Sequence, residues 1–220
     1  MLLDLTGRPV SSVLGNTLNN ARAVALAQTL GLHRNPSGWK RPDSEKSLRI
    51  RLWWAVLIHD RWYVFLNLYL HPAIADRKRS SFAHGIPPTI AKNQYDVPLP
   101  VSENLGFVRL CTLSTILGDV LPLVYDLSIG GEIWRRIRRV EVDLDQWEEE
   151  SSPDIGSSIR LGYLSIRLLV CRISLHQASA SDQDAQRYHF SQLRRAAIEI
   201  VDYICTLTKT HFNEFWLPCT

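Results

Sequence analysis

Residues 133–147 read IWRRIRRVEVDLDQW, and this stretch decides the fold class. Its apolar side chains recur every three or four positions, at Ile133, Ile137, Val140, Leu144 and Trp147. An α-helix turns once in 3.6 residues, so this spacing gathers all of them on one face. The stretch therefore predicts an amphipathic helix that buries one side against a core.

The next stretch predicts a more deeply buried helix. One apolar stripe is formed by Ile159, Tyr163, Ile166, Val170 and Ile173, and leucines occupy the other faces at Leu161, Leu164 and Leu168. A helix that is apolar on most sides is a buried one. Residues 151–154, Ser-Ser-Pro-Asp, separate the two helices and are expected to cap the second. Together the two stretches predict a buried central helical hairpin.

Helical spacing recurs along the rest of the chain. An N-terminal helix is indicated by the stripe Leu14, Leu18, Ala21 and Ala25, and Gly31 is well placed to end it. Residues 42–44, Pro-Asp-Ser, are expected to begin a second helix with the stripe Leu48, Leu52, Ala55 and His59. A third helical region is expected over 102–127, bent or interrupted by Pro122. A last helix is indicated by Leu193, Ala197, Ile200, Ile204 and Leu207.

No convincing strand pattern appears, and residues 85–100 are punctuated by Pro and Gly. The predicted fold class is therefore all-α, with several helices over residues 1–220, a Pro-rich loop after the second helix and a buried central helical hairpin. The 45% hydrophobic content excludes a disordered tail. The 25 Lys and Arg nearly balance the 22 Asp and Glu, so the chain as a whole has no general attraction to nucleic acid.

Two features of the sequence bear on its environment. Four widely spaced cysteines, at Cys111, Cys171, Cys205 and Cys219, form no Cys-x-x-Cys pair and are expected to be reduced thiols. The apolar run from Leu52 to Ala75 is long enough for a membrane span, but an Asp60-Arg61 pair in its middle would be costly in a bilayer. We therefore expect a soluble protein without a membrane partner.

A search for catalytic and metal-binding motifs finds none, so no catalytic, cofactor-binding or metal-binding residue is predicted. The acidic run Glu148-Glu149-Glu150 is expected to be a solvated helix end. Asp60 is expected to form an ion pair with Arg49 or Arg51 that fixes its helix against its neighbours. The alternative, in which Asp60 is a partly buried catalytic base, is kept as a hypothesis.

A basic cluster is formed by Arg135, Arg136, Arg138 and Arg139. Helical spacing favours a solvated face, with Trp134 and Ile137 pointing inward and Arg139 paired with Asp143. The alternative is a nuclear import signal or a contact with a polyanion.

Three groups of residues, taken in order, resemble a known family. Residues 27–34 read AQTLGLHR and contain Leu30, Gly31, Leu32, His33 and Arg34. Residues 49–54 read RIRLWW, with Arg51, Trp53 and Trp54, and Asp60-Arg61-Trp62 follows. Residues 85–90 read GIPPTI, with Pro87, and residues 96–100 read DVPLP, with Asp96, Pro98 and Pro100. Each motif alone is weak, but the ordered set resembles the fungal-specific transcription factor domain, the middle homology (xylanolytic activator-type) region of Zn2Cys6 regulators.

The resemblance implies a nuclear regulator that controls DNA-templated transcription through protein contacts or a small-molecule inducer. Its partners would be the transcription machinery or regulatory proteins. In that family a cluster of six closely spaced cysteines holds zinc and contacts DNA, whereas this sequence has four distant cysteines. Zinc and DNA binding are therefore expected only in a cluster outside these residues, no cofactor is expected within them, and the chain is expected to be a fragment.

Residues 63–79 depart from the family pattern, because removing them joins Asp60-Arg61-Trp62 directly to Ser80-Ser81-Phe82-Ala83-His84-Gly85. Trp62-Tyr63-Val64 is encoded by a sequence that contains GTAYGT, which resembles a splice donor. We interpret 63–79 as a translated retained intron. The alternative is a genuine loop insertion, whose apolar side chains should then pack somewhere.

The sequence is compatible with three functions. The regulatory region of a transcription factor is the leading hypothesis, because it accounts for the ordered motifs. A helical scaffold or adaptor would share the core pattern without those motifs. An all-α enzyme would use Asp60 or the carboxylates at 148–150, and would require a substrate pocket that converges on them.

Overall fold

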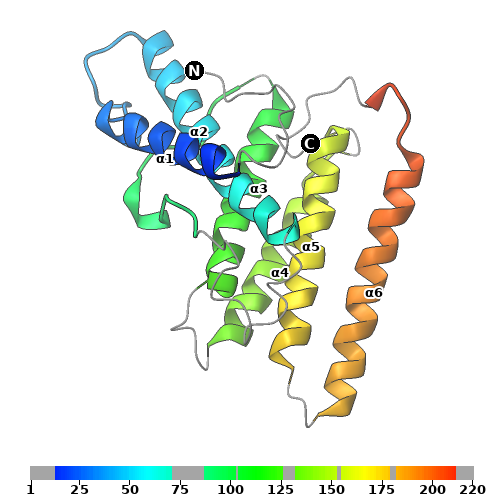
Figure 1. Cartoon of the computed structure of the whole chain (residues 1–220). Helices are drawn as coiled ribbons and strands as arrows, with labels where there is room; N and C mark the ends of the chain where they lie inside the picture. Colours follow the sequence, from blue (N-terminus) through cyan, green and yellow to red (C-terminus); the bar gives the residue numbers. More distant parts are fainter. Residues whose placement is uncertain are drawn as a thin grey trace. The chain divides into compact units, whose positions relative to one another are not determined.

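The computed structural model describes residues 13–70, 87–102, 104–125, 132–152, 155–178 and 182–211. Over these residues the chain is helical and contains no strand, which confirms the predicted all-α class. The elements, labelled in Figure 1, are α1 (Val13–Thr29), α2 (Asp43–Leu70), the short 3-10 helix η3 (Lys92–Gln94), α3 (Leu105–Tyr125), α4 (Ile133–Glu149), α5 (Ser157–Gln177) and α6 (Gln183–Thr206).

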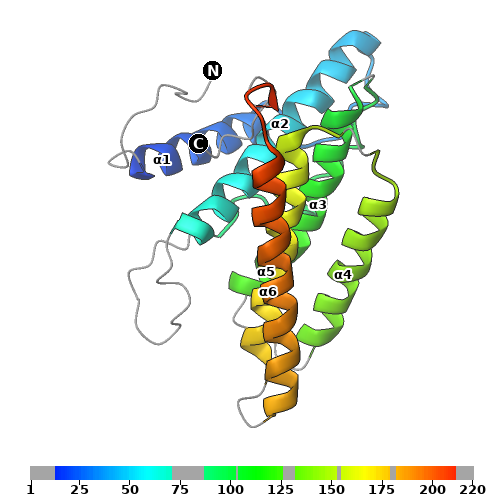
Figure 2. The same cartoon turned by 90° about the vertical axis from the view of Figure 1, so that its right-hand side faces the viewer.

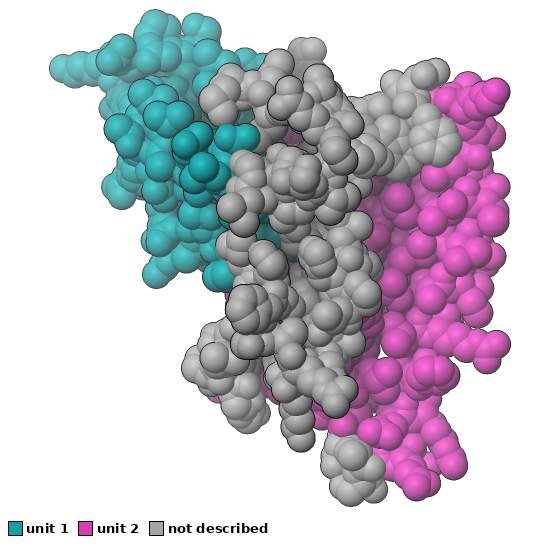
Figure 3. All heavy atoms as spheres, viewed as in Figure 1, with its two compact units in different colours: residues 1–103, 218–220 teal, residues 104–217 magenta. Residues whose placement is uncertain are grey.

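The chain divides into two compact units, which Figure 3 shows in different colours. The first comprises residues 1–103 and 218–220 and contains α1, α2 and η3. The second comprises residues 104–217 and contains α3 to α6. Each unit has its own buried side chains.

The end of α1 follows the sequence prediction closely. Gly31 has a φ of +65°, a left-handed conformation that glycine adopts without steric cost. Its N–H donates to the Gln28 carbonyl at 2.9 Å, and the Leu32 N–H donates to the Ala27 carbonyl at 2.9 Å. These two bonds form a Schellman motif, which satisfies carbonyls at the helix end and turns the chain away from the axis of α1.

The buried faces of α1 and α2 differ from the predicted ones. On α1 the buried side chains are Asn20, Val24 and Ala27, whereas Leu18, Ala21 and Ala25 of the predicted stripe are exposed and the side chain of Leu14 lies outside the described residues. On α2 the predicted stripe of Leu48, Leu52, Ala55 and His59 is exposed or half-buried. The buried face instead carries Trp53, Trp54, Leu57, Ile58, Asp60, Arg61, Trp62, Val64 and Phe65.

The reason for this difference is a set of large aromatic and polar groups. Tryptophan buries more area than leucine or alanine, so Trp53, Trp54 and Trp62 determine which face of α2 is covered. On α1, Asn20 donates a hydrogen bond to Asp60 of α2 at 2.8 Å, which fixes the rotation of α1. A search for apolar stripes alone does not detect that bond.

In the second unit α5 is the central helix, since it contacts α3, α4 and α6. Figures 1 and 2 show α6 running alongside α5 in both views. The predicted stripe of α4 is buried at every position, and so is the main stripe of α5, from Ile159 to Ile173. These two helices form the predicted buried hairpin. The N-cap of α5 is Gly156, with a φ of +88°, and not a side chain of the Ser-Ser-Pro-Asp segment.

Helix α3 continues through Pro122 to Tyr125, so the expected interruption does not occur. Proline removes one backbone donor, and that loss of one hydrogen bond does not end the helix here. Among the described residues, Leu105–Val124 is the one helical stretch long and apolar enough to cross a membrane by length and composition. The core helix of a soluble protein passes the same test, and α3 buries Leu110, Leu113, Leu117 and Leu121 in its unit.

Helix α6 has no fully buried residue. Its predicted stripe is half-buried at Leu193, Ala197 and Ile200, while Ile204 is exposed. A second apolar side, with Phe190, Ile198 and Val201, is exposed as well. Helix α6 therefore covers α5 with one face only.

Candidate functional site

Asp60 is the buried centre of the family-motif residues in the first unit. Its side chain has no exposed surface and accepts three hydrogen bonds. Asn20 Nδ2 of α1 donates at 2.8 Å, and the backbone N–H groups of Thr89 and Ile90 donate at 3.2 and 3.0 Å. Asp60 thus joins α1, α2 and the Pro-rich loop through fixed donors, as buried polar groups require.

The predicted ion pair of Asp60 with Arg49 or Arg51 is wrong. Arg49 instead donates from its guanidinium to the Leu30 carbonyl at 2.5 Å and lies over the Trp39 ring at 4.7 Å. Arg51 is exposed, on the side of α2 away from Asp60. The prediction that Asp60 fixes its helix against neighbouring segments is retained, but through neutral donors.

The two tryptophans of the RIRLWW motif pack against the loop that follows α2. Trp54 Nε1 donates to the Pro98 carbonyl at 2.7 Å, and Trp53 lies 5.6 Å from the Tyr95 ring between centroids. Arg61, which is buried, donates to the Tyr95 hydroxyl at 3.2 Å. Tyr95 was not singled out in the sequence, although it directly precedes the DVPLP motif.

The LGLHR and DVPLP motifs meet each other. The Asp96 N–H donates to the His33 carbonyl at 3.2 Å, and the Asp96 carboxylate accepts from the Asn35 N–H at 2.7 Å. Arg34 lies 3.6 Å from the same carboxylate. The His33 ring lies 6.1 Å from the Trp53 ring between centroids. The structure therefore brings together motifs that are more than 60 residues apart in sequence.

Some of the remaining motif residues are buried and others are exposed. Leu32 and Pro100 are buried, whereas Leu30, Pro87 and the ring of Pro98 are exposed. No described histidine, cysteine or second carboxylate joins Asp60 to form a metal-binding group. The arrangement can hold two helices and a loop together through polar atoms of Asp60, Trp54 and Arg61, whereas Trp53 Nε1 and His33 Nδ1 have no hydrogen-bond partner among the described residues.

Two carboxylates of the acidic run at the end of α4 form ion pairs that the sequence analysis did not predict. Glu148 accepts hydrogen bonds from the Tyr163 hydroxyl and from Arg160, at 2.7 Å for the latter, and Arg167 lies 3.5 Å away. Glu150 pairs with Arg109 of α3 at 3.3 Å, while Glu149 is exposed. The expectation of a solvated run holds for Glu149 and Glu150, which are exposed, and is wrong for Glu148, because Arg160 and Arg167 of α5 reach that carboxylate.

Burial and hydrogen bonding act in opposite directions on this cluster. Burial acts to raise the pKa of the Glu148 carboxyl, but hydrogen bonds from Tyr163 and Arg160 and the nearby arginine charges hold that pKa below its usual value. Burial and the bond to Glu148 raise the pKa of the Tyr163 hydroxyl. Tyr163 also stacks on Trp147, with 5.2 Å between ring centroids. The cluster links α4 to α5.

All four arginines of the basic cluster, Arg135, Arg136, Arg138 and Arg139, are exposed, as the solvated-face interpretation predicts. Two details of that interpretation are wrong. Trp134 is 44% exposed and stacks on His189 rather than pointing inward. Arg139 and Asp143 form no ion pair in the described part of the chain, whereas Arg135 pairs with Glu132 at 3.3 Å.

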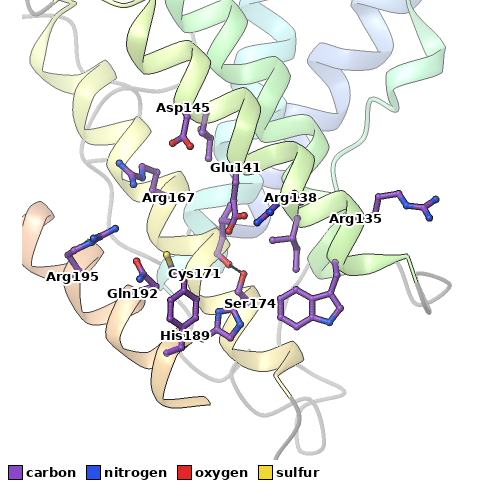
Figure 4. Close-up of a pocket in the computed structure, with 15 residues that line it drawn as sticks. Arg135, Arg138, Glu141, Asp145, Arg167, Cys171, Ser174, His189, Gln192 and Arg195 are labelled. Carbon is purple, nitrogen blue, oxygen red and sulfur yellow. Dashed lines mark hydrogen bonds between the residues drawn. The ribbon is translucent and has the colours of Figure 1, made fainter. Parts of the chain in front are cut away.

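A cavity of about 730 Å³ lies between α4, α5 and α6 in the second unit. It is lined by Arg138 and Glu141 of α4, Arg167 and Cys171 of α5, and His189 and Arg195 of α6 (Figure 4), among others. Sequence analysis did not locate this cavity, because it is made by side chains from three separate helices. Cys171, like Cys111 and Cys205, has a free thiol, and Cys219 lies outside the described residues.

The described residues form a helical fold in which the motif residues pack two helices and a loop together. Residues 21–67, which run from α1 into α2, match the family described as the fungal specific transcription factor domain. The resemblance predicted from the motifs is confirmed over these residues, which are similar to that domain.

Curated relatives agree with this assignment. A transcriptional regulatory protein of Schizosaccharomyces pombe is 30% identical over 123 residues, which cover 54% of this chain and 18% of the relative. Transcriptional activator protein DAL81 of Saccharomyces cerevisiae is 22% identical over 253 residues, covering 90% and 26% respectively. Cutinase transcription factor 1 beta of Fusarium vanettenii is 26% identical over 111 residues, covering 50% and 11%.

The chain thus spans about a quarter or less of the length of these relatives. No solved structure matches it significantly.

Proposed function

We propose that this chain is the regulatory, middle homology region of a fungal zinc-cluster transcription factor. It controls DNA-templated transcription through contacts with proteins or an inducer, and base reading belongs to a zinc cluster outside these residues. The observation that carries the proposal is the domain match over residues 21–67, within which Trp53, Trp54 and Asp60 hold the motif segments together. The relatives are named as transcription regulators, which supports this proposal.

The whole protein acts in the nucleus, with the transcription machinery or regulatory proteins as partners. The exposed row of Arg135, Arg136, Arg138 and Arg139 supports a contact with an import receptor or another acidic surface. The runner-up function is a helical scaffold or adaptor without a role in transcription. The ordered motifs favour the regulatory function, because a generic scaffold has no need of them.

A tethering experiment separates the two functions. Residues 1–220 are fused to an unrelated DNA-binding domain in a fungal cell that carries a reporter gene with the matching site. We expect reporter transcription to change relative to the DNA-binding domain alone, in either direction. A fusion that accumulates, is helical and leaves transcription unchanged would contradict the proposal and favour the adaptor.

A further inference from the structure

The cavity between α4, α5 and α6 has the size of a small-molecule site. Its volume of about 730 Å³ lies within the 300–1,000 Å³ that is usual for such sites. Buried side chains of Ile137, Leu144 and Val170 form part of its wall. Its lining therefore combines an apolar surface with a group of charged side chains.

The charges in the cavity are predominantly positive. Four arginines line it against two carboxylates, Glu141 and Asp145. Arg167 is already bound to Glu148, whereas Arg138 and Arg195 form no ion pair within the described part of the chain. Figure 4 shows Arg138, Arg167 and Arg195 projecting from three different helices toward the cavity. Arg138 and Arg195 are both exposed, and a guanidinium without an ion-pair partner can bind a carboxylate through two parallel hydrogen bonds.

The fourth arginine does not take part in this group. Arg135 pairs with Glu132 at 3.3 Å, and in Figure 4 its guanidinium points away from Glu141. The positive charge available to a ligand is therefore that of Arg138 and Arg195, with Arg167 nearby.

Flat aromatic groups form one end of the cavity. Trp134 and His189 are stacked with 5.3 Å between ring centroids and 26° between planes. Tyr188 meets His189 edge-on at 5.2 Å. Stacked and edge-on rings accept a further planar ring with a favourable geometry. A ligand that fits this end has a planar, apolar body.

Glu141 faces the same space and would oppose an anion if it were fully ionised. Burial raises the pKa of its carboxyl, although the charges of Arg138, His189 and Arg167 act to lower it. Glu141 and Asp145 are nevertheless outnumbered by the four arginines of the lining, so the cavity keeps a positive charge that favours an anionic ligand.

We infer that this cavity binds a small organic anion in which a carboxylate is attached to a planar, apolar ring system. The carboxylate would bind Arg195 and Arg138, and the ring would lie against Trp134, His189 and Tyr188. That such a ligand regulates transcription rests on the proposed function, whereas binding itself does not.

The test uses 2-naphthoate as the probe and 2-naphthamide as its neutral counterpart, with affinities measured by calorimetry on the full chain. We expect saturable binding of 2-naphthoate, and binding of the amide weaker by about tenfold or more, because a charge-assisted hydrogen bond is lost. Arg195→Ala and Arg138→Ala should weaken naphthoate binding to a similar extent. Arg194→Ala is the matched control, because Arg194 is exposed on the same helix but does not line the cavity.

Three results would overturn the inference: no saturable binding of naphthoate, equal affinity for acid and amide, or equal effects of Arg195→Ala and Arg194→Ala. Circular dichroism of each variant confirms that the helices persist. The tethered reporter is a separate readout. If naphthoate does not bind but the reporter responds, only the ligand site is contradicted. If naphthoate binds but the reporter does not respond, only the transcriptional role is contradicted.

Discussion

Asp60 shows how a polar residue can decide the packing of an apolar helix pair. Its partners are Asn20, 40 positions earlier, and the N–H groups at 89 and 90, about 30 positions later. Because these partners are distant in sequence, sequence analysis predicted Arg49 or Arg51 as the partner of Asp60 and did not identify Asn20 or the loop N–H groups. What local sequence does reveal is that a carboxylate between tryptophans must be satisfied, because an unpaired buried charge is too costly.

Replacement of Asp60 by Asn tests this role. In Asn, an NH2 group replaces one of the two carboxylate oxygens of Asp60. That group cannot accept a hydrogen bond, so at least one of the donors around position 60 loses its bond. We expect the free energy of unfolding to fall by about 2–3 kcal/mol, measured by urea denaturation followed by circular dichroism. Asp43→Asn, at the exposed start of α2, is the control and should change stability by less than about 0.5 kcal/mol. Equal stability of both variants would revive the hypothesis of a catalytic Asp60.

The cysteines differ in reactivity according to their burial. Burial raises the pKa of the Cys111 thiol to about 12, whereas Cys205 is exposed on α6. Because the thiolate is the reactive form, iodoacetamide at pH 8 should modify Cys205 at least about tenfold faster than Cys111 in the folded chain. Peptide mass spectrometry measures both rates, and urea should abolish the difference. Equal rates in the folded chain would show that Cys111 is not in the core.

At the scale of the helix, the clearest sequence signals gave the most accurate predictions. The stripes of α4 and α5 are confirmed because each is apolar at every turn, and on α5 further buried side chains such as Leu164 add to that stripe without replacing it. On α1 and α2 two faces compete, and the choice is made by Trp53, Trp62 and the bond from Asn20 to Asp60. The periodicity of leucine and alanine carries no information about that bond.

The link between α4 and α5 yields a pH prediction. The folded-state pKa of Glu148 lies below its usual value, so its contribution to stability is present above about pH 4.5 and is lost as the pH falls through the folded-state pKa. Glu148→Gln should lower the free energy of unfolding by about 1 kcal/mol at pH 7, a modest value because a third of the side chain is exposed and screened.

Denaturant unfolding of wild type and Glu148→Gln at pH 7 and at pH 3 measures this effect, and the two curves should converge at the lower pH. The matched control is Glu149→Gln, because Glu149 is the exposed neighbour in the same run. A stability difference that stays constant with pH would show that the ion-pair cluster does not hold α4 to α5.

Residues 63–79 have two interpretations, a translated retained intron and a genuine insertion. Residues 63–70 continue α2, where Val64 and Phe65 are buried and the Tyr63 hydroxyl lies 2.7 Å from Thr17 Oγ1. A genuine insertion is expected to pack in this way. Residues 71–79 lie outside the described residues, and the retained-intron hypothesis is still a prediction about the transcript.

For the whole molecule, the sequence predicted the all-α class and the family, because ordered motifs and helical periods are local signals. It did not predict the two-unit division or the cavity, since both arise from how separate helices meet. Arg167 and Arg195 were not singled out in the sequence, and Arg138 was considered only within the basic cluster of α4. The three become a group only when α4, α5 and α6 assemble. This chain matches a limited part of the length of its relatives, so function at this scale belongs to the proposal.

Sequencing of the full mature transcript from this locus tests the central claim most directly. The account predicts one message that encodes six closely spaced cysteines upstream of these residues, in the same reading frame, and the retained-intron hypothesis predicts that the codons for 63–79 are absent from it. A message that encodes no such cluster would contradict the assignment to a zinc-cluster transcription factor and place the adaptor function first. A message that includes codons 63–79 would show that these residues are a genuine insertion.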